Sequence, residues 1–326
     1  MKPSNLLVSI LALSCALALM APAHAEYPDR PIKLLTPTPP GVSTTDLAAR
    51  LIAEKMSARL GSPVIVVNQP GASGTLAANV IAKGPKDGYT MYLGVASALG
   101  YAKLFNRDLP YDPVKDLAPV AMLGTVPVGL FVNVASDIKT PQDLIAAAKA
   151  RPDALNYSSS GIGSVTHVAI EMLMRRADVK MKHVPYGASL AFWNDLMAGT
   201  IQVVGGGVSG GMPLVKDGRL RLIATASRER SAMAPDVPAF GELFPGFDVP
   251  AWFGLVVAQG TPEPVIAKLE AAALSVFNEP SFKSTLLQAG IEVAPLSRKA
   301  YAAKLTNEMP LWESTLKDAG MSAPAK

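Results

Sequence analysis

Apolar and polar positions along this chain follow two alternating patterns, one typical of buried strands and the other of amphipathic helices. Short apolar runs rich in β-branched residues at 31–37 (PIKLLTP) and 64–68 (VIVVN) predict strands. Between them, apolar residues recur at helical spacing over 44–60, and Gly61 follows as a helix stop signal. The pattern therefore predicts an α/β protein.

The same alternation continues over most of the chain. Further helices are predicted at 75–83, 144–150, 164–176, 188–198, 264–277 and 298–319, and further strands at 89–94, 155–158, 181–185, 201–204 and 219–226. Pro310 should kink the last helix. Such alternation favours parallel sheets with helices on both faces.

Two long apolar stretches, 126–134 and 252–258, interrupt this rhythm. They suit the strands by which a chain leaves one domain and later returns to it. About 300 residues also exceed the usual size of a single domain. We therefore expect a discontinuous first domain, residues 26–125 with 251–326, and a second domain, residues 126–250.

The first 25 residues have the pattern of a secretory signal peptide. Lys2 is followed by the apolar stretch 6–20, which is too short to span a bilayer comfortably, and Ala23-His24-Ala25 reads as a cleavage site. The mature chain should then begin at Glu26. Lipidation at Cys15 is an alternative, although Ala12 stands where a lipobox prefers leucine and the apolar run continues past the cysteine.

Composition excludes several classes of function. Cys15 is the sole cysteine, so the mature chain can form no disulfide and no thiolate metal site, and its two histidines are too few for an all-histidine site. We predict no metal and no cofactor. Without Lys2 there are 29 basic and 26 acidic residues, which gives a net charge of +3. The basic residues form no cluster, so we expect no nucleic-acid partner. No later stretch is apolar enough to insert into a membrane, which predicts a soluble, exported protein.

Several predicted strands end in loops rich in glycine, serine and threonine. These loops cover residues 36–46, 67–74, 94–100, 158–167 and 203–211. Ligands of open α/β sheets bind outside the carboxyl ends of the strands, and such loops offer backbone N–H groups, hydroxyls and helix N-termini to an anion. Any one of them could equally be a plain turn, and Ser164 suits a helix N-cap that requires no ligand. Together they suggest a carboxylate-binding cleft between two domains.

A secreted serine hydrolase using Ser164 and His167 is a remote alternative. No G-x-S-x-G elbow surrounds Ser164, and no acidic residue is placed to orient His167. The glycine-rich stretches also lack the spacing of dinucleotide-binding and P-loop motifs. No catalytic residue is therefore predicted.

Several stretches in order resemble one family, from Tyr27 to about Gly320. They include YPDRPIKLLTPTPPG, VVNQPGASGTLAA, KDGYTMYLG, LPYDPVKDLAPVAMLG, LNYSSSGIGSVTHVAIEML and PDVPAFGELFPGFDVPAWFGLVVAQGTP. The chain resembles the solute receptors of tripartite tricarboxylate transporters, also called TctC or Bug-type proteins. The resemblance implies a monomeric periplasmic binding protein of type II fold, with two α/β domains joined by two crossing strands and no catalysis.

The resemblance also implies a ligand and a partner. The ligand would be a small carboxylate, held partly through water, and the partner would be a membrane permease; a signalling protein that reads the same receptor is the alternative partner. By position, the ligand-binding residues would be Thr38, Gly41, Ser43, Ala72, Gly74, Ser160, Gly161, Gly163, Ser164, His167, Tyr186 and Gly206.

This sequence departs from the family pattern at three places. Val42 stands where a second glycine is usual, and 185–188 (PYGA) lacks the usual lysine. Gly205 and Gly206 replace a usual Phe-Asp pair. The missing side chains should leave room and remove a negative charge from the pocket, which favours an aromatic or medium-chain dicarboxylate without an amino group. The alternative is that a neighbouring side chain such as Trp193 fills the gap.

Overall fold

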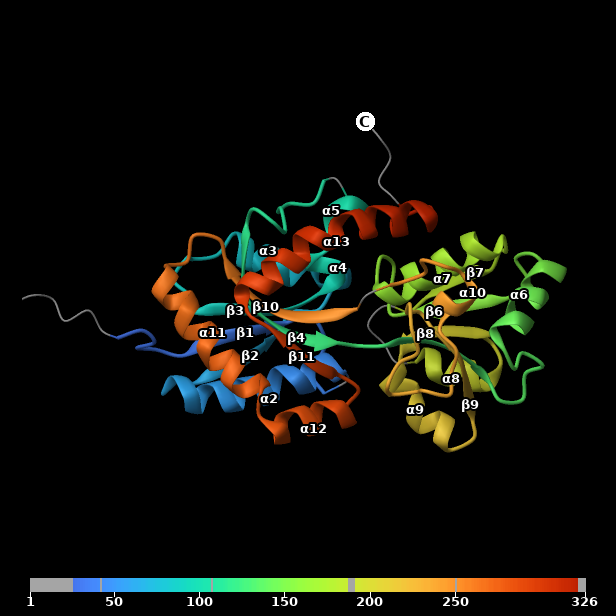
Figure 1. Ribbon diagram of the computed structural model, residues 1–326, viewed down its shortest axis with the longest axis horizontal. Helices are drawn as coiled ribbons and strands as arrows, with labels where there is room; N and C mark the ends of the chain where they lie inside the picture. Colours follow the sequence, from blue (N-terminus) through green and yellow to red (C-terminus); the bar gives the residue numbers. More distant parts are fainter. Residues whose placement is uncertain (1–25, 42, 107, 187–190, 250, 322–326) are drawn as a thin grey trace, which may run out of the picture.

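The computed structural model describes residues 26–321, apart from 42, 107, 187–190 and 250. The predicted signal peptide, Cys15 and Val42 thus lie outside the described residues. Two lobes lie side by side along the longest axis of the molecule, and each is built around one β-sheet (Figure 1). None of the helices within the described ranges is both long and apolar enough to cross a membrane.

The first lobe holds a six-stranded sheet, sheet A, in the order β11-β4-β10-β3-β1-β2. Its strands are β1 (Ile32–Thr36), β2 (Val64–Asn68), β3 (Thr90–Val95), β4 (Leu117–Thr125), β10 (Trp252–Ala258) and β11 (Glu292–Leu296). Its helices are α2 (Thr44–Leu60), η1 (Ala72–Gly74), α3 (Thr75–Ala82), α4 (Ala96–Leu99), α5 (Ala102–Phe105), α11 (Glu263–Phe277), α12 (Pro280–Gln288) and α13 (Arg298–Asp318).

The second lobe holds a five-stranded sheet, sheet B, in the order β7-β6-β8-β5-β9. Its strands are β5 (Val128–Asn133), β6 (Asn156–Ser159), β7 (Lys182–Pro185), β8 (Val203–Gly207) and β9 (Leu220–Thr225). Its helices are α6 (Pro141–Ala150), α7 (Val165–Ala177), α8 (Phe192–Ala198), α9 (Val208–Lys216) and α10 (Phe240–Leu243).

The prediction of parallel sheets is only partly right. Strands β1, β2 and β3 pair in parallel, as do β6, β7 and β8. Strand β10, however, pairs antiparallel with β3 and β4, β11 with β4, and β5 with β8 and β9. A strand that returns from the other lobe enters its sheet from the opposite end, so both sheets are mixed.

The crossing between the lobes is shorter than predicted. Strand β4 ends in sheet A at Thr125, and β5 begins in sheet B at Val128, so the predicted strand 126–134 belongs to sheet B and β4 was not foreseen. The chain returns to sheet A through β10, as its apolar run suggested. The boundaries of the two domains stay a prediction, although sheet membership changes close to them.

Helix α2 shows why the sequence folds locally as it does. The hydroxyl of Ser43 accepts a hydrogen bond from the Asp46 amide and caps the first turn, while Gly61 ends the helix with φ of 67°. Its small and apolar side chains, among them Ala49, Ile52 and Met56, are fully buried against sheet A. This anchored helix fixes the position of the loop that precedes it.

One hydrophobic core runs from the first lobe into the second. It joins the α3 and α13 side of sheet A to the α7 side of sheet B. Helix α13 continues through Pro310 and reaches across toward the second lobe (Figure 1). The ring of Trp312 lies 4.3 Å from that of Tyr101, also of the first lobe, and both are buried. Helix α13 also contacts α7, so the two lobes are in direct contact.

Candidate functional site

The loop between β1 and α2 is held by a buried carboxylate. Asp46, 1% exposed, accepts hydrogen bonds from the Gly41 amide (2.8 Å), Arg50 Nε (2.8 Å) and Asn68 Nδ2 (2.7 Å). Burial alone would raise the pKa of Asp46, but the hydrogen bonds from Arg50, Asn68 and Gly41 lower it overall. Asp46 thus stays ionised, and its charge stabilises the loop through these hydrogen bonds.

Two hydroxyls predicted to bind ligand lie together in this loop. Ser43 Oγ donates to Thr38 Oγ1 across 2.8 Å, and Asn68 Nδ2 also donates to the Thr38 carbonyl, again at 2.8 Å. Because the Thr38 hydroxyl accepts here, its own proton is free to reach a carboxylate.

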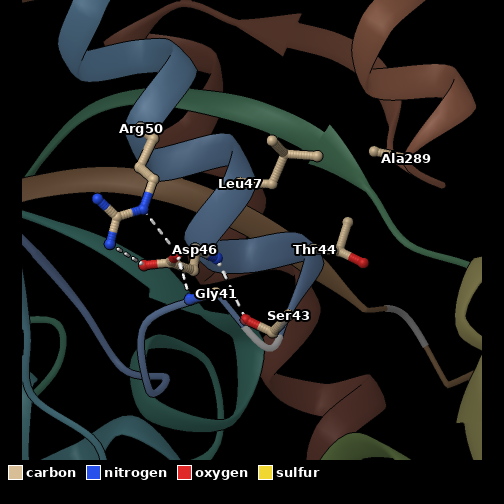
Figure 2. Close-up of a pocket in the computed structure, with 7 residues that line it drawn as sticks. All are labelled: Gly41, Ser43, Thr44, Asp46, Leu47, Arg50 and Ala289. Carbon is tan, nitrogen blue, oxygen red and sulfur yellow. Dashed lines mark hydrogen bonds and ion pairs between the residues drawn. The ribbon is translucent and has the colours of Figure 1, made fainter.

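A cavity of about 420 Å³ opens beside this loop (Figure 2). Its volume lies within the usual range of small-molecule sites. Its lining residues are Gly41, Ser43, Thr44, Asp46, Leu47, Arg50 and Ala289. It shares Gly41 and Ser43 with the predicted site, but none of the described residues of sheet B or its helices lines it. The cavity thus overlaps the predicted site only at these two residues of the first loop.

The turn after β2 has an unusual backbone. Four consecutive residues have positive φ: Gly71 (129°), Ala72 (47°), Ser73 (51°) and Gly74 (93°). A side chain at Gly74 would meet Tyr92 Oη at 2.6 Å, so only glycine fits. The Tyr92 hydroxyl donates to the Gly74 carbonyl at 3.0 Å, which holds the turn in place.

The loop between β6 and α7, residues 160–164, lies opposite this turn. Ser73 Oγ donates to the Ile162 carbonyl at 2.8 Å, and the Tyr101 hydroxyl donates to the Gly163 carbonyl at 2.9 Å. Neither Ser73 nor Tyr101 was predicted to matter here. The two bonds bring predicted residues of the two lobes together: Ala72 and Gly74 from the first, and Ser160, Gly161, Gly163 and Ser164 from the second.

Most donors inside the 160–164 loop are already paired. The Ser160 amide donates to Thr166 Oγ1 at 3.0 Å, and the Gly163 amide donates to His167 Nδ1 at 3.1 Å. Ser164 caps α7, its Oγ accepting from the His167 amide at 3.2 Å. Gly161, Gly163 and Ser164 are buried, whereas Ser160 and Ile162 are exposed. Within this loop, Ser160 is therefore the predicted residue that a ligand could reach directly.

Tyr186 and Gly206 face other partners. The Tyr186 hydroxyl donates to Asp195 Oδ2, a bond that raises the pKa of Tyr186. A Cβ at Gly206 would meet the ring of Trp193 at 2.9 Å, and a Cβ at Gly205 would meet the Thr166 carbonyl at the same distance. Trp193 fills the place where open space was predicted, so that prediction was wrong.

The stretch 203–211 is also not a loop. Strand β8 runs to Gly207, and α9 begins at Val208 and includes Gly210 and Gly211. Glycine lowers helix propensity, which hid this helix from the sequence pattern. A Cβ at Gly211 would meet the ring of Phe131 at 2.3 Å, so the glycine lets α9 pack closely on sheet B.

Ser164 and His167 do not form a nucleophile and base. Ser164 Oγ contacts the His167 amide and Thr166 Oγ1, and the imidazole Nδ1 accepts from Gly163. The remaining ring nitrogen, Nε2, faces Glu171 Oε1 at 3.6 Å, so the prediction that no acidic residue is placed to orient His167 was wrong. Over the described residues there is also no group of three or more His, Cys, Asp or Glu side chains that could hold a metal ion.

Comparison with known proteins identifies the family. Residues 48–321 match the model of the tripartite tricarboxylate transporter family receptor, TctC. Protein BugT of Bordetella pertussis is 34% identical over 82% of this chain and 83% of its own. A protein of Cupriavidus necator, described as a UPF0065 protein in the gbd 5′ region, is 35% identical over 90% of each chain. The chain therefore belongs to the TctC, or Bug-type, family of solute-binding receptors, whose members are not enzymes.

Solved structures agree on the fold. The chain is similar to Rhodopseudomonas palustris Rpa4515 with adipate, with a TM-score of 0.84 and 30% identity over 91% of this chain and 99% of that one. It is also similar to MatC (Rpa3494) of the same organism with bound malate, with a TM-score of 0.80 and 31% identity over 89% of this chain and 100% of that one. The fold is the two-lobed type II periplasmic binding protein fold, as the resemblance implied.

Proposed function

We propose that this receptor captures a small dicarboxylate in the periplasm and delivers it to the membrane subunits of a tripartite transporter. The observation that carries the proposal is the meeting of the η1 turn with the 160–164 loop through the Ser73–Ile162 and Tyr101–Gly163 hydrogen bonds. Each of these segments follows a parallel strand, where α/β sheets bind ligands. The adipate and malate of the two similar structures support a dicarboxylate.

The ligand should sit between the hydroxyl pair of the first loop and the start of α7. The free proton of Thr38, the hydroxyls of Ser43 and Ser160, and the positive end of the α7 dipole suit a carboxylate. The backbone at Gly41, Ala72, Gly74, Gly161 and Gly163 and the N-cap Ser164 shape the wall. Three or four charge-assisted hydrogen bonds, less the cost of association, correspond to a Kd of about 1 μM.

The shape of the second lobe narrows the choice of ligand. The ring of Trp193 covers Gly206 and occupies the space that the sequence analysis predicted for an aromatic ligand. Aspartate and glutamate are disfavoured because the acidic side chain that would pair their ammonium group is replaced by Gly206. A medium-chain aliphatic dicarboxylate such as adipate is the ligand we propose.

Calorimetric titration with succinate, malate, adipate, phthalate, citrate and aspartate tests this proposal. Adipate should bind at about 1 μM, and Ser160→Ala should weaken it by about tenfold, since one hydrogen bond to a charged group is lost. Ser281→Ala, a matched change of an exposed serine on α12, should leave the affinity unchanged. Tighter binding of aspartate than of adipate would contradict the ligand class, and no binding by any of the six would contradict the function.

The cellular localisation and the partner of the receptor need separate measurements. The exported protein should begin at Glu26 and carry no acyl chain, which mass spectrometry of the periplasmic fraction measures. A pull-down with the ligand-loaded receptor should recover transporter membrane subunits, and recovery of a sensor ectodomain alone would argue for signalling instead.

A further inference from the structure

Behind the 160–164 loop lies a cluster of titratable side chains that the ligand does not need to touch. The loop depends on two glycines with positive φ, Gly161 (122°) and Gly163 (75°). Glycine loses more backbone freedom on folding than any other residue, so such a loop keeps one shape only if its backbone is tied down. Each glycine is held in place through hydrogen bonding by a different histidine.

His167 ties Gly163. Its Nδ1 accepts the Gly163 N–H at 3.1 Å, and its Nε2 lies 3.6 Å from Glu171 Oε1. The tautomer is therefore set, with the proton on Nε2 facing the carboxylate and Nδ1 left as an acceptor. Burial acts to raise the pKa of Glu171, but the contacts with His167 and with the hydroxyl of Tyr157 lower it overall. Glu171 thus stays ionised and orients the ring.

His183 ties Gly161 through one intermediate hydroxyl. Its Nε2 lies 2.9 Å from Ser159 Oγ, which in turn lies 3.3 Å from both the amide and the carbonyl of Gly161. The ring of His183 also stacks on that of His167, with centroids 4.1 Å apart and planes 16° apart. Two neighbouring imidazoles on α7 and β7 thus hold the two glycines that shape the loop.

We propose that Glu171 and His183 are positioning residues for ligand binding. Glu171 fixes the orientation of the His167 ring, His183 fixes the hydroxyl of Ser159, and together they hold the 160–164 loop in the shape that receives the dicarboxylate. This inference rests on the proposed function. The groups that face the pair are Glu171 from α7 and Tyr157 from β6. On β7, the neighbouring Lys182 is exposed, because alternate side chains of a strand point to opposite faces.

The stack itself supports this role. Burial, and then the neighbouring His167, lower the pKa of His183 to about 4, so His183 is neutral at pH 7 and stacks on His167 without charge repulsion.

Calorimetric titration of adipate at pH 7.5 tests the proposal. Glu171→Gln and His183→Phe should each bind adipate about fivefold more weakly than wild type, because the loop loses one of the hydrogen bonds that hold it. Phenylalanine keeps the stack but removes the bond to Ser159. Lys182→Gln, on the same strand, should behave as wild type.

Wild-type affinity in both variants would overturn the proposal, provided that circular dichroism shows the variants to be folded. Nitrogen NMR of the wild-type histidines is independent of any ligand. We expect His167 as the Nε2–H tautomer at pH 7.5, because Nδ1 accepts the Gly163 amide. An Nδ1–H tautomer would overturn the positioning role. If wild type bound none of the six acids, the proposed function would fail, and the NMR result alone would decide this inference.

Discussion

The β1–α2 loop and the β6–α7 loop occupy equivalent places in the two lobes, since each follows a parallel strand and leads into a helix. The first is held by the ionised Asp46 with Arg50 and Asn68 around it. The second is held by two imidazole rings, His167 directly and His183 through Ser159. One wall of the site therefore depends on a charged carboxylate, and the other on stacked rings of which His183 is neutral at pH 7.

The largest expected effect comes from removing the anchor of the first loop. Asp46→Ala should lower the free energy of unfolding by roughly 3 kcal/mol, because the Gly41 amide and the Asn68 amide group lose a buried, charged acceptor. Urea unfolding measures the loss. Asp137→Ala, at an exposed aspartate, should change stability by less than about 0.5 kcal/mol. Similar losses for both would show that Asp46 anchors nothing.

The second loop is tested by its positive-φ glycine. Gly163→Ala should cost about 2 kcal/mol, because φ is 75° and the new Cβ would lie 3.1 Å from the ring of Phe105. Gly199→Ala is the matched control, with φ of 78° and no atom within 4 Å of its Cβ, and should cost about 1 kcal/mol. The difference between the two urea midpoints isolates the contact with Phe105, and its absence would mean that the loop can shift freely.

The pH dependence of stability should separate the two loops. The folded pKa of His183, about 4, lies below the ordinary value of 6.5, so the unfolded chain binds more protons between these values. Stability should therefore fall as pH drops from about 6.5 to about 4, by about 1 kcal/mol after allowing for solvent around a half-buried ring. His183→Phe should flatten this part of the urea-midpoint profile. If His183→Phe leaves the slope of stability against pH unchanged, another group causes the loss of stability in acid.

The smallest effect should come from the bond that joins the lobes. Ser73→Ala removes the donor to the Ile162 carbonyl and should weaken adipate binding by up to about fivefold, with stability nearly unchanged. Small-angle scattering with adipate should show less compaction in this variant than in wild type. If Ser73→Ala closes as fully as wild type, the Ser73–Ile162 bond is not needed for closure.

Local signals predicted much of the fold. Helix α2 has the predicted limits because Ser43 and Gly61 are strong capping signals, and β2 covers the predicted 64–68. Strand β11 and helix α12 were missed. Strand β11 contains Pro295, and prolines are disfavoured inside sheets, so its pattern did not look like a strand. Helix α12 begins with Pro280, a helix N-terminal signal that the prediction did not use.

The site was less predictable because its geometry depends on distant residues. Ser73 and Ile162 are 89 positions apart, and Tyr101 and Gly163 are 62 apart, so nothing local marks them as partners. Glu171 stands four residues after His167, a spacing at which helical side chains meet, and could have been found from that spacing. Trp193 was the alternative occupant of the space beside Gly206, and the packing of α8 places its ring there.

The position of β10 in sheet A has a consequence for the order in which the exported chain folds. Strand β10 lies between β3 and β4, so the sheet of the first lobe stays split until residues 252–258 are present. Sheet B is instead continuous in sequence, from β5 to β9, so all of its strands precede β10 along the chain. The first lobe therefore begins the chain, but its sheet can be completed only after every strand of the second lobe has emerged.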